Sequence, residues 1–257
     1  MSDLTAFGPE GGLCVVVGAT GSLGSAVTRR RVARGGAVVA VARGKEALDE
    51  LAATSRLVRP CVADIGDDAC VPTIAGHLDA PVRLALMSAG LPVRGSADTI
   101  EPASLTGGFD IKVGGTLRLL HAVRDRLLPG SRFVAVAGTL GIEPRAHEAG
   151  PGAVNAAVLN LMRQISLLYG PKGVTVHTLA PGPADTPRLR RIVTAVAAER
   201  GTPLEEVWAE YLAQNSLGRL PTVDEIAWAV TVLLDPEADI LHGGVLHLDA
   251  GGLRGSH

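Results

Sequence analysis

Aromatic residues are scarce in this sequence. Two tryptophans, two tyrosines and three phenylalanines make up 3% of its 257 residues. Proteins that bind single-stranded nucleic acids stack bases on aromatic side chains and neutralise phosphates with a basic surface. Because aromatics are few and the formal net charge is -2, the composition argues against a nucleic-acid partner.

Cysteines are also few, and long apolar runs are absent. Cys14, Cys61 and Cys70 show no metal-ligand spacing, so we interpret them as buried free thiols and expect no metal site. No uninterrupted apolar run reaches the roughly 18 residues that suggest a membrane span. The first residues lack the basic and apolar regions of a signal peptide. We therefore expect a cytoplasmic protein with no membrane partner.

The sequence does contain a regular alternation of short apolar runs with longer segments of helical periodicity. The runs lie at residues 13–19, 37–42, 57–63, 82–89, 132–138 and 174–180, and residues 244–248 add a seventh. This alternation is typical of βαβ units and of a parallel sheet covered by helices on both faces. We predict an α/β fold, a Rossmann-like doubly wound parallel sheet of about seven strands, built by residues 1–257 as a single domain.

Two helices are expected beside the later strands. Apolar residues at helical spacing predict one long amphipathic helix over residues 104–128. A second helix begins near Pro151, where a missing N–H costs nothing, and ends at Pro171 and Gly173.

The first apolar run leads directly into a glycine-rich turn. Its glycines are Gly18, Gly21 and Gly24, with Thr20, Ser22 and Leu23 between them. Glycines after a first strand let the backbone approach a pyrophosphate, which the N–H groups of the following helix stabilise. The turn therefore predicts a dinucleotide site.

The end of the second apolar run indicates which dinucleotide is preferred. Ala42 stands where an acidic residue would bind the ribose 2′-hydroxyl of NAD, and Arg43 follows it. Because a guanidinium favours the 2′-phosphate, we expect NADP(H) to be favoured over NAD(H).

Several further motifs resemble those of the short-chain dehydrogenase/reductase family. The resemblance covers about residues 12–252, and its motifs are Asp64-Ile65, Ala89-Gly90 and the loop Pro181-Gly182 to Thr186. It implies that these residues, with those of the glycine-rich turn and Arg43, bind the cofactor. It also implies a substrate lid near residues 187–218, a small-molecule substrate, and a homotetramer or homodimer built on the two helices described above.

The catalytic tetrad of that family is absent. The family's asparagine, serine, tyrosine and lysine fall on Lys112, Gly138, Pro151 and Asn155. The only tyrosines, Tyr169 and Tyr211, lie elsewhere, at the far end of the second helix and in the lid segment. Proton transfer by this chain therefore requires other groups.

Three other residues are candidates for catalysis. Lys112 adds an amine whose pKa shifts readily on burial, Thr139 neighbours the lost serine, and His147 lies on the loop before Pro151. An atypical NADP(H)-dependent oxidoreductase acting on a small-molecule carbonyl or alcohol is the interpretation that the retained Pro-Gly loop favours. The alternatives are a non-redox lyase, isomerase or cyclase with Lys112 as base, or a non-catalytic cofactor-binding subunit or sensor.

Overall fold

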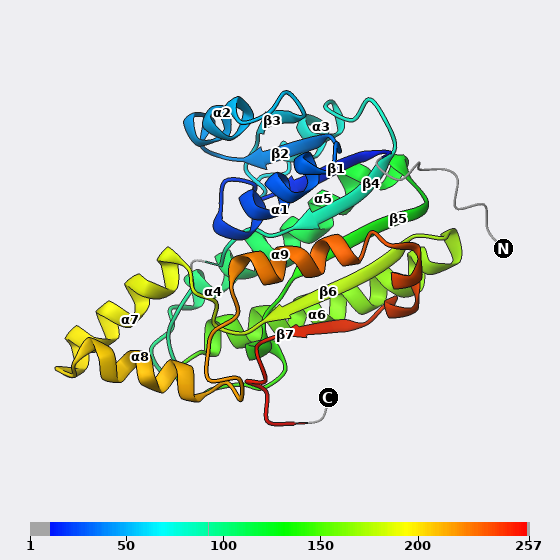
Figure 1. The fold of residues 1–257 in the computed structure, drawn as a ribbon. Coiled ribbons are helices and arrows are strands. Elements are labelled where there is room, and N and C mark those ends of the chain that lie inside the picture. The colour runs from blue at the N-terminus through cyan, green and yellow to red at the C-terminus, as the bar shows by residue number, and fades with distance from the viewer. Residues whose placement is uncertain (1–10, 92, 256–257) are drawn as a thin grey trace.

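The computed structural model describes residues 11–91 and 93–255, which contain a seven-stranded parallel sheet (Figure 1). The strand order is β3-β2-β1-β4-β5-β6-β7, and every neighbouring pair is parallel. The predicted doubly wound sheet is therefore confirmed. The strands are β1 Leu13–Val17, β2 Val38–Ala42, β3 Val58–Val62, β4 Val82–Met87, β5 Leu127–Val136, β6 Thr175–Pro181 and β7 Val245–Leu248.

Helices follow the strands along the chain and cover both faces of the sheet (Figure 1). One face carries α3, α5 and α6, and the other carries α1, α2 and α9. The helices are α1 Ser22–Ala33, α2 Lys45–Ala53, α3 Cys70–Ala75, α4 Pro102–Phe109, α5 Gly115–Val123, α6 Ala149–Tyr169, α7 Pro187–Arg200, α8 Leu204–Ala213 and α9 Val223–Val232.

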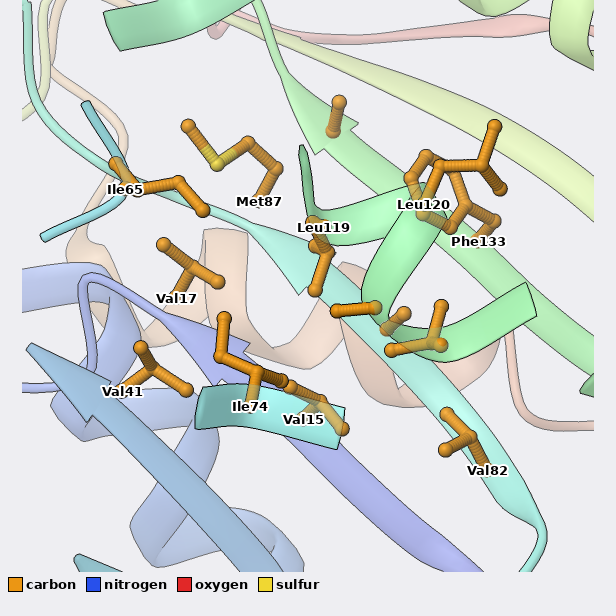
Figure 2. Packing of buried hydrophobic residues seen from close by; sticks show 14 of the residues in the cluster. Val15, Val17, Val41, Ile65, Ile74, Val82, Met87, Leu119, Leu120 and Phe133 are labelled. Atoms are coloured by element: carbon orange, nitrogen blue, oxygen red, sulfur yellow. The ribbon is translucent and has the colours of Figure 1, made fainter. Parts of the chain in front are cut away.

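Two hydrophobic cores lie on opposite faces of the sheet. Along β1, Val15 and Val17 enter the core beneath α3, α5 and α6, whereas Cys14 and Val16 enter the core beneath α1, α2 and α9. Figure 2 shows the first core, where Leu119 of α5 packs with the strand valines. Because successive strand residues point to opposite faces, burial on both sides requires the continuous apolar runs seen in the sequence.

The prediction of a single helix over residues 104–128 is wrong. The segment contains α4, a π-helical turn at Asp110–Gly114, α5 and a 3₁₀ turn at Arg124–Arg126, and β5 already begins at Leu127. Leu128 precedes Pro129, and a residue before proline is disfavoured in the α conformation, so the chain is extended there. Leu127 and Leu128 fit the apolar pattern of a strand as well as the apolar stripe of a helix, so the spacing alone extended the predicted helix too far.

Helices α7 and α8 project from the body of the sheet near its carboxyl ends (Figure 1). They share a small core of their own that includes Leu189, Val193 and Val207. The Thr186 side chain caps α7 by accepting a hydrogen bond from the Leu189 N–H, and Gly201, at φ 63°, ends this helix. Residues 201–203 thus separate two packed helices.

A neutral histidine is buried inside β6. His177 is fully buried, its Nδ1–H donates to the Leu241 carbonyl, and its Nε2 accepts from the Thr175 hydroxyl. Burial and then the nearby Arg132 guanidinium lower the pKa of His177 from 6.5 to about 4. The unfolded chain therefore binds a proton before the folded chain does as the pH falls.

We predict that stability decreases as the pH falls from about 6.5 to about 4, with His177 accounting for up to about 3 kcal/mol. Chemical denaturation across this pH range should show a flatter profile for His177→Gln than for the parent. His121→Gln, which replaces an exposed histidine on α5, is the control and should follow the parent. Parallel profiles for the parent and His177→Gln would contradict the prediction.

Candidate cofactor and active site

A cavity of about 850 Å³ lies at the carboxyl ends of β1, β2 and β4. This is where the strand order reverses, between β1 and β4, and where doubly wound folds bind ligands. Its volume is within the range of about 300–1,000 Å³ typical of small-molecule sites. The predicted cofactor residues that line it are Gly18, Thr20, Gly21, Arg43, Asp64, Ile65, Ala89 and Gly90.

The glycine-rich turn needs its glycines for different reasons. Gly18 has φ +79°, and a Cβ there would lie 3.0 Å from the Ala89 backbone. A Cβ on Gly24 would lie 2.2 Å from the Gly18 carbonyl oxygen, so Gly24 permits close packing and does not line the cavity. Ser22, the first residue of α1, does not line it either.

The first turn of α1 is open to an anion. Gly21 is the N-cap, no side chain caps the helix, and no acidic residue lies in its first turn. The unpaired N–H groups of such a turn, with the positive end of the helix dipole, favour a phosphate or another anion.

Arg43 follows β2 and is exposed at the edge of the cavity. Within the described part of the chain, its side chain has no carboxylate at ion-pair distance. Asp64 lies across the same cavity, but its Oδ1 accepts a hydrogen bond from the Gly66 N–H and so stabilises its own turn. The guanidinium of Arg43 thus remains available to a ligand.

A smaller cavity of about 290 Å³ adjoins the first and shares Ser88, Ala89, Gly90 and Arg188 with it. Lys112, Pro151 and Asn155 line it, and these are three of the four positions on which the sequence resemblance places the family's catalytic residues. The remaining predicted cofactor residues that line it are Leu23, Pro181, Gly182 and Thr186.

Lys112 lies in the π-helical turn at the wall of this smaller cavity, and such turns are frequent at functional sites. Its Nζ donates to the carbonyl oxygens of Val136, at 2.8 Å, and Ala137, at 3.2 Å. A third hydrogen bond, also 3.2 Å long, goes to Oδ1 of Asn155. No carboxylate pairs with it among the residues that the structure describes, and burial followed by repulsion from Arg188 lowers its pKa from 10.5 to about 8.

Lys112 and Asn155 exchange the residue types that the resembling family has at these two positions. The ammonium and the amide are consequently still neighbours, but the ammonium now belongs to the π-helical turn and the amide to α6. Gly138 accommodates the exchange, because a Cβ at this position would lie 2.8 Å from Asn155 Nδ2. The absence of a side chain at Gly138 and the position of the Asn155 amide are therefore sterically linked.

The other catalytic candidates lie outside the smaller cavity. Thr139 is half-buried in a 3₁₀ turn beside Glu143 and Arg145, and His147 is on the exposed loop before α6. Tyr169 is buried at the far end of α6, and Tyr211 packs in the core of α7 and α8. Of the candidates named from the sequence, the structure brings only Lys112 into the wall of this cavity.

Three arginines near the site were missed by the sequence analysis. Arg94, Arg188 and Arg191 line the larger cavity, and Arg188 also lines the smaller one. The basic start of α7, residues 187–191, was a signal, but its position over the cavity follows only from the fold.

The topology and the cavity at the strand-order reversal define a doubly wound α/β protein of the Rossmann-like class. The family model described as enoyl-(acyl carrier protein) reductase matches residues 18–252. The chain therefore belongs to this family of short-chain dehydrogenases and reductases. No helix among the described residues is both long enough and apolar enough to span a membrane.

Two curated relatives extend over almost the whole chain. The short-chain reductase protein NovJ of Streptomyces niveus is 27% identical over 93% of this chain and 93% of its own length. The cis-4-hydroxycyclohexanecarboxylate dehydrogenase of Sinomonas cyclohexanicum is 29% identical over 93% of this chain and 95% of its own length.

Solved structures share the fold. An NADPH-bound short-chain oxidoreductase from Pseudomonas aeruginosa PAO1, described as containing an atypical catalytic center, superposes with a TM-score of 0.86 at 23% identity, covering 97% of this chain and 100% of its own. The L-sorbose reductase of Gluconobacter frateurii, complexed with NADPH and L-sorbose, has a TM-score of 0.87 at 17% identity. The superposition covers 95% of this chain and 97% of that one.

We predict that Gly138→Ala destabilises the protein because the new Cβ meets the Asn155 amide. In a double-mutant cycle the effect should be smaller in an Asn155→Ala background, with a coupling energy of about 0.5–3 kcal/mol from chemical denaturation. Gly107→Ala is the control, since a Cβ at this exposed position of α4 meets no atom within 4 Å. Additive effects of Gly138→Ala and Asn155→Ala would show that the two positions are not coupled.

Proposed function

We propose that this protein is an NADP(H)-dependent oxidoreductase that acts on a small-molecule carbonyl or alcohol and uses Lys112 as its proton donor and acceptor. The observation that carries the proposal is the position of Lys112. Its buried ammonium lies in the wall of a small cavity that adjoins a larger one with the features of a dinucleotide site.

The residues of the larger cavity fit a phosphorylated dinucleotide. Its volume suffices, Gly18 and Gly21 bring backbone to its surface, and the uncapped start of α1 is adjacent. Arg43 would contact the 2′-phosphate, while Ala42 leaves no carboxylate to repel it. When bound, a nicotinamide cofactor supplies or accepts a hydride.

Lys112 can supply the proton that accompanies carbonyl reduction. An ammonium has three N–H donors, and all three are used, so a substrate oxygen would replace one of the two longer partners, Ala137 or Asn155. Since its pKa is about 8, the amine is mostly protonated at neutral pH and can donate to a developing alkoxide. In the reverse direction the neutral amine accepts the proton of an alcohol.

The surroundings of Lys112 support this role over one for Thr139 or His147. Three acceptors fix its ammonium, whereas His147 is exposed and Thr139 faces a different, much smaller cavity. The NADPH-bound Pseudomonas structure with an atypical catalytic center, and the two relatives named as a reductase and a dehydrogenase, also support an oxidoreductase.

Two further features belong to the proposal. Helices α7 and α8 would form the lid over the substrate, because Thr186 and Arg188 at the start of α7 line the smaller cavity. A homodimer or homotetramer would cover Leu117 of α5 and Leu167 and Leu168 of α6, which are exposed large apolar side chains on the helices expected to build the interface.

The cofactor proposal predicts tighter binding of NADPH than of NADH. Fluorescence titration should show the difference in the parent, and Arg43→Ala should weaken NADPH about tenfold or more while leaving NADH nearly unchanged. Arg34→Ala, at the exposed C-terminal end of α1, is the control and should bind as the parent does. Equal affinities of the parent for the two cofactors would exclude the preference.

The proposal for Lys112 predicts a specific pH dependence. The kcat/KM for NADPH-dependent reduction, measured over a panel of cyclic and aliphatic ketones, should fall above pH about 8 as the ammonium deprotonates. Oxidation of the matching alcohols should instead rise with pH up to about 8.

Lys112→Met should lower both activities about 10²–10⁴-fold with NADPH affinity within a few-fold of the parent. Lys172→Met, which replaces an exposed lysine after α6, is the control and should leave activity unchanged. A Lys112→Met variant as active as the parent would remove Lys112 from the mechanism. If the parent binds NADPH but turns over no substrate of the panel, a non-catalytic cofactor-binding role would gain support.

A further inference from the structure

Three arginines face the larger cavity from the side of the lid. Arg188 and Arg191 belong to the first turns of α7, and Arg94 lies on the loop after β4. Arg188 lies where the two cavities meet, because it lines both of them. Its Nη2 donates to the Leu91 carbonyl, which directs the guanidinium toward Gly90, where a Cβ would lie 3.5 Å from its Nη1.

These three positive charges lack a matching negative charge. Within residues 11–91 and 93–255, no carboxylate lies at ion-pair distance from Arg94, Arg188 or Arg191. Burial lowers the pKa of Arg188, and the charges of Arg94 and Arg191 lower it further while Glu148 opposes them. The like charges are therefore close together, and one carboxylate lies nearby, beyond pairing distance. Neighbouring Arg190, by contrast, forms two hydrogen bonds of 2.9 Å with Asp185.

The positive charges of Arg188 and Arg191 also destabilise the N-terminal end of α7. Helix N-termini carry a partial positive charge and favour acidic residues, yet the first turn of α7 contains none and is followed by Arg190 and Arg191. Unpaired like charges at the positive end of a helix are unfavourable unless an anion binds between them.

A second anion-binding element lines the same cavity. Gly21, the N-cap of α1, lines it, and a dinucleotide rests its pyrophosphate on such a glycine-rich turn at an uncapped helix start. The three arginines and the glycine-rich turn, which come from different elements of the fold, therefore line one cavity.

We propose that Arg188 and Arg191, assisted by Arg94, clamp the pyrophosphate of the dinucleotide against the glycine-rich turn. The inference rests on the proposed cofactor and assigns these lid residues a binding role. Guanidinium groups suit it, because their N–H donors match phosphate oxygens in pairs. Arg43 selects for the 2′-phosphate, whereas the clamp contacts a group that NADPH and NADH share.

This division of roles gives the experiment. NADPH and NADH are titrated by fluorescence into the parent, Arg188→Ala, Arg191→Ala, the double variant, Arg43→Ala and Arg190→Ala. Each clamp variant should weaken both cofactors by a similar factor of about 10 to 100, as expected for a lost charge-assisted hydrogen bond. Arg43→Ala should weaken NADPH alone, and Arg190→Ala, which removes a paired arginine of the same helix, should bind both as the parent does.

Inorganic pyrophosphate provides a readout that is independent of the nicotinamide. It should raise the melting temperature of the parent, Arg43→Ala and Arg190→Ala, and this shift should be lost in the Arg188→Ala/Arg191→Ala double variant. The melting temperatures without pyrophosphate show that each variant is folded. Arg191 is exposed, so Arg191→Ala keeps the test valid if Arg188→Ala does not fold.

Unchanged affinity of the clamp variants for both cofactors would overturn the inference, as would an equal pyrophosphate shift in every variant. If the substrate KM rose instead while cofactor binding remained unchanged, the arginines would bind an anionic group of the substrate and the pyrophosphate clamp would be wrong. If the parent bound pyrophosphate but neither cofactor, the proposed function would fail and the anion site would remain.

Discussion

The buried ammonium of Lys112 is the interaction on which the candidate active site depends. It joins three elements that meet only in the folded protein, since it lies in a π-helical turn, donates to two carbonyls after and at the end of β5, and reaches an amide of α6. Removing one partner of such a buried group leaves the others without hydrogen bonds, which is more costly than the bonds themselves are favourable. The same network holds Lys112, the residue that we propose as proton donor and acceptor, in the wall of the smaller cavity.

Around this network the fold places two cavities with different chemistry. The larger one is formed where the strand order reverses, so its wall includes strand ends and the glycine-rich turn up to Gly21, the N-cap of α1. Arg43, Arg94, Arg188 and Arg191 line it, and Arg188 also lines the smaller cavity. An anionic ligand in the larger cavity would balance charges that the described residues leave unpaired, and it would lie next to the lysine.

The strands were predictable because both faces of a parallel sheet are buried, which requires short continuous apolar runs. The end of helix α5 was not predictable from apolar spacing, because Leu127 and Leu128 fit a helical stripe as well as a strand. Pro129 decides between them, since the residue before a proline disfavours the α conformation. Most predicted cofactor residues do line the two cavities, since they follow directly on strands. Ser22 and Gly24 line neither cavity. The glycine-rich turn contains both residues that line the cavity and residues, such as Gly24, that only allow the turn to pack.

The sequence by itself determined the alternation of strands and helices and the glycine-rich turn, both of which depend on residue types at short spacing. Only the tertiary structure decided that Lys112 meets Asn155, 43 residues away, and that Gly138 leaves room for this pair. It also brought Arg94 to the same cavity as Arg188 and Arg191. Contacts between residues so distant in the chain depend on how helices pack on the sheet, and no local periodicity encodes that packing.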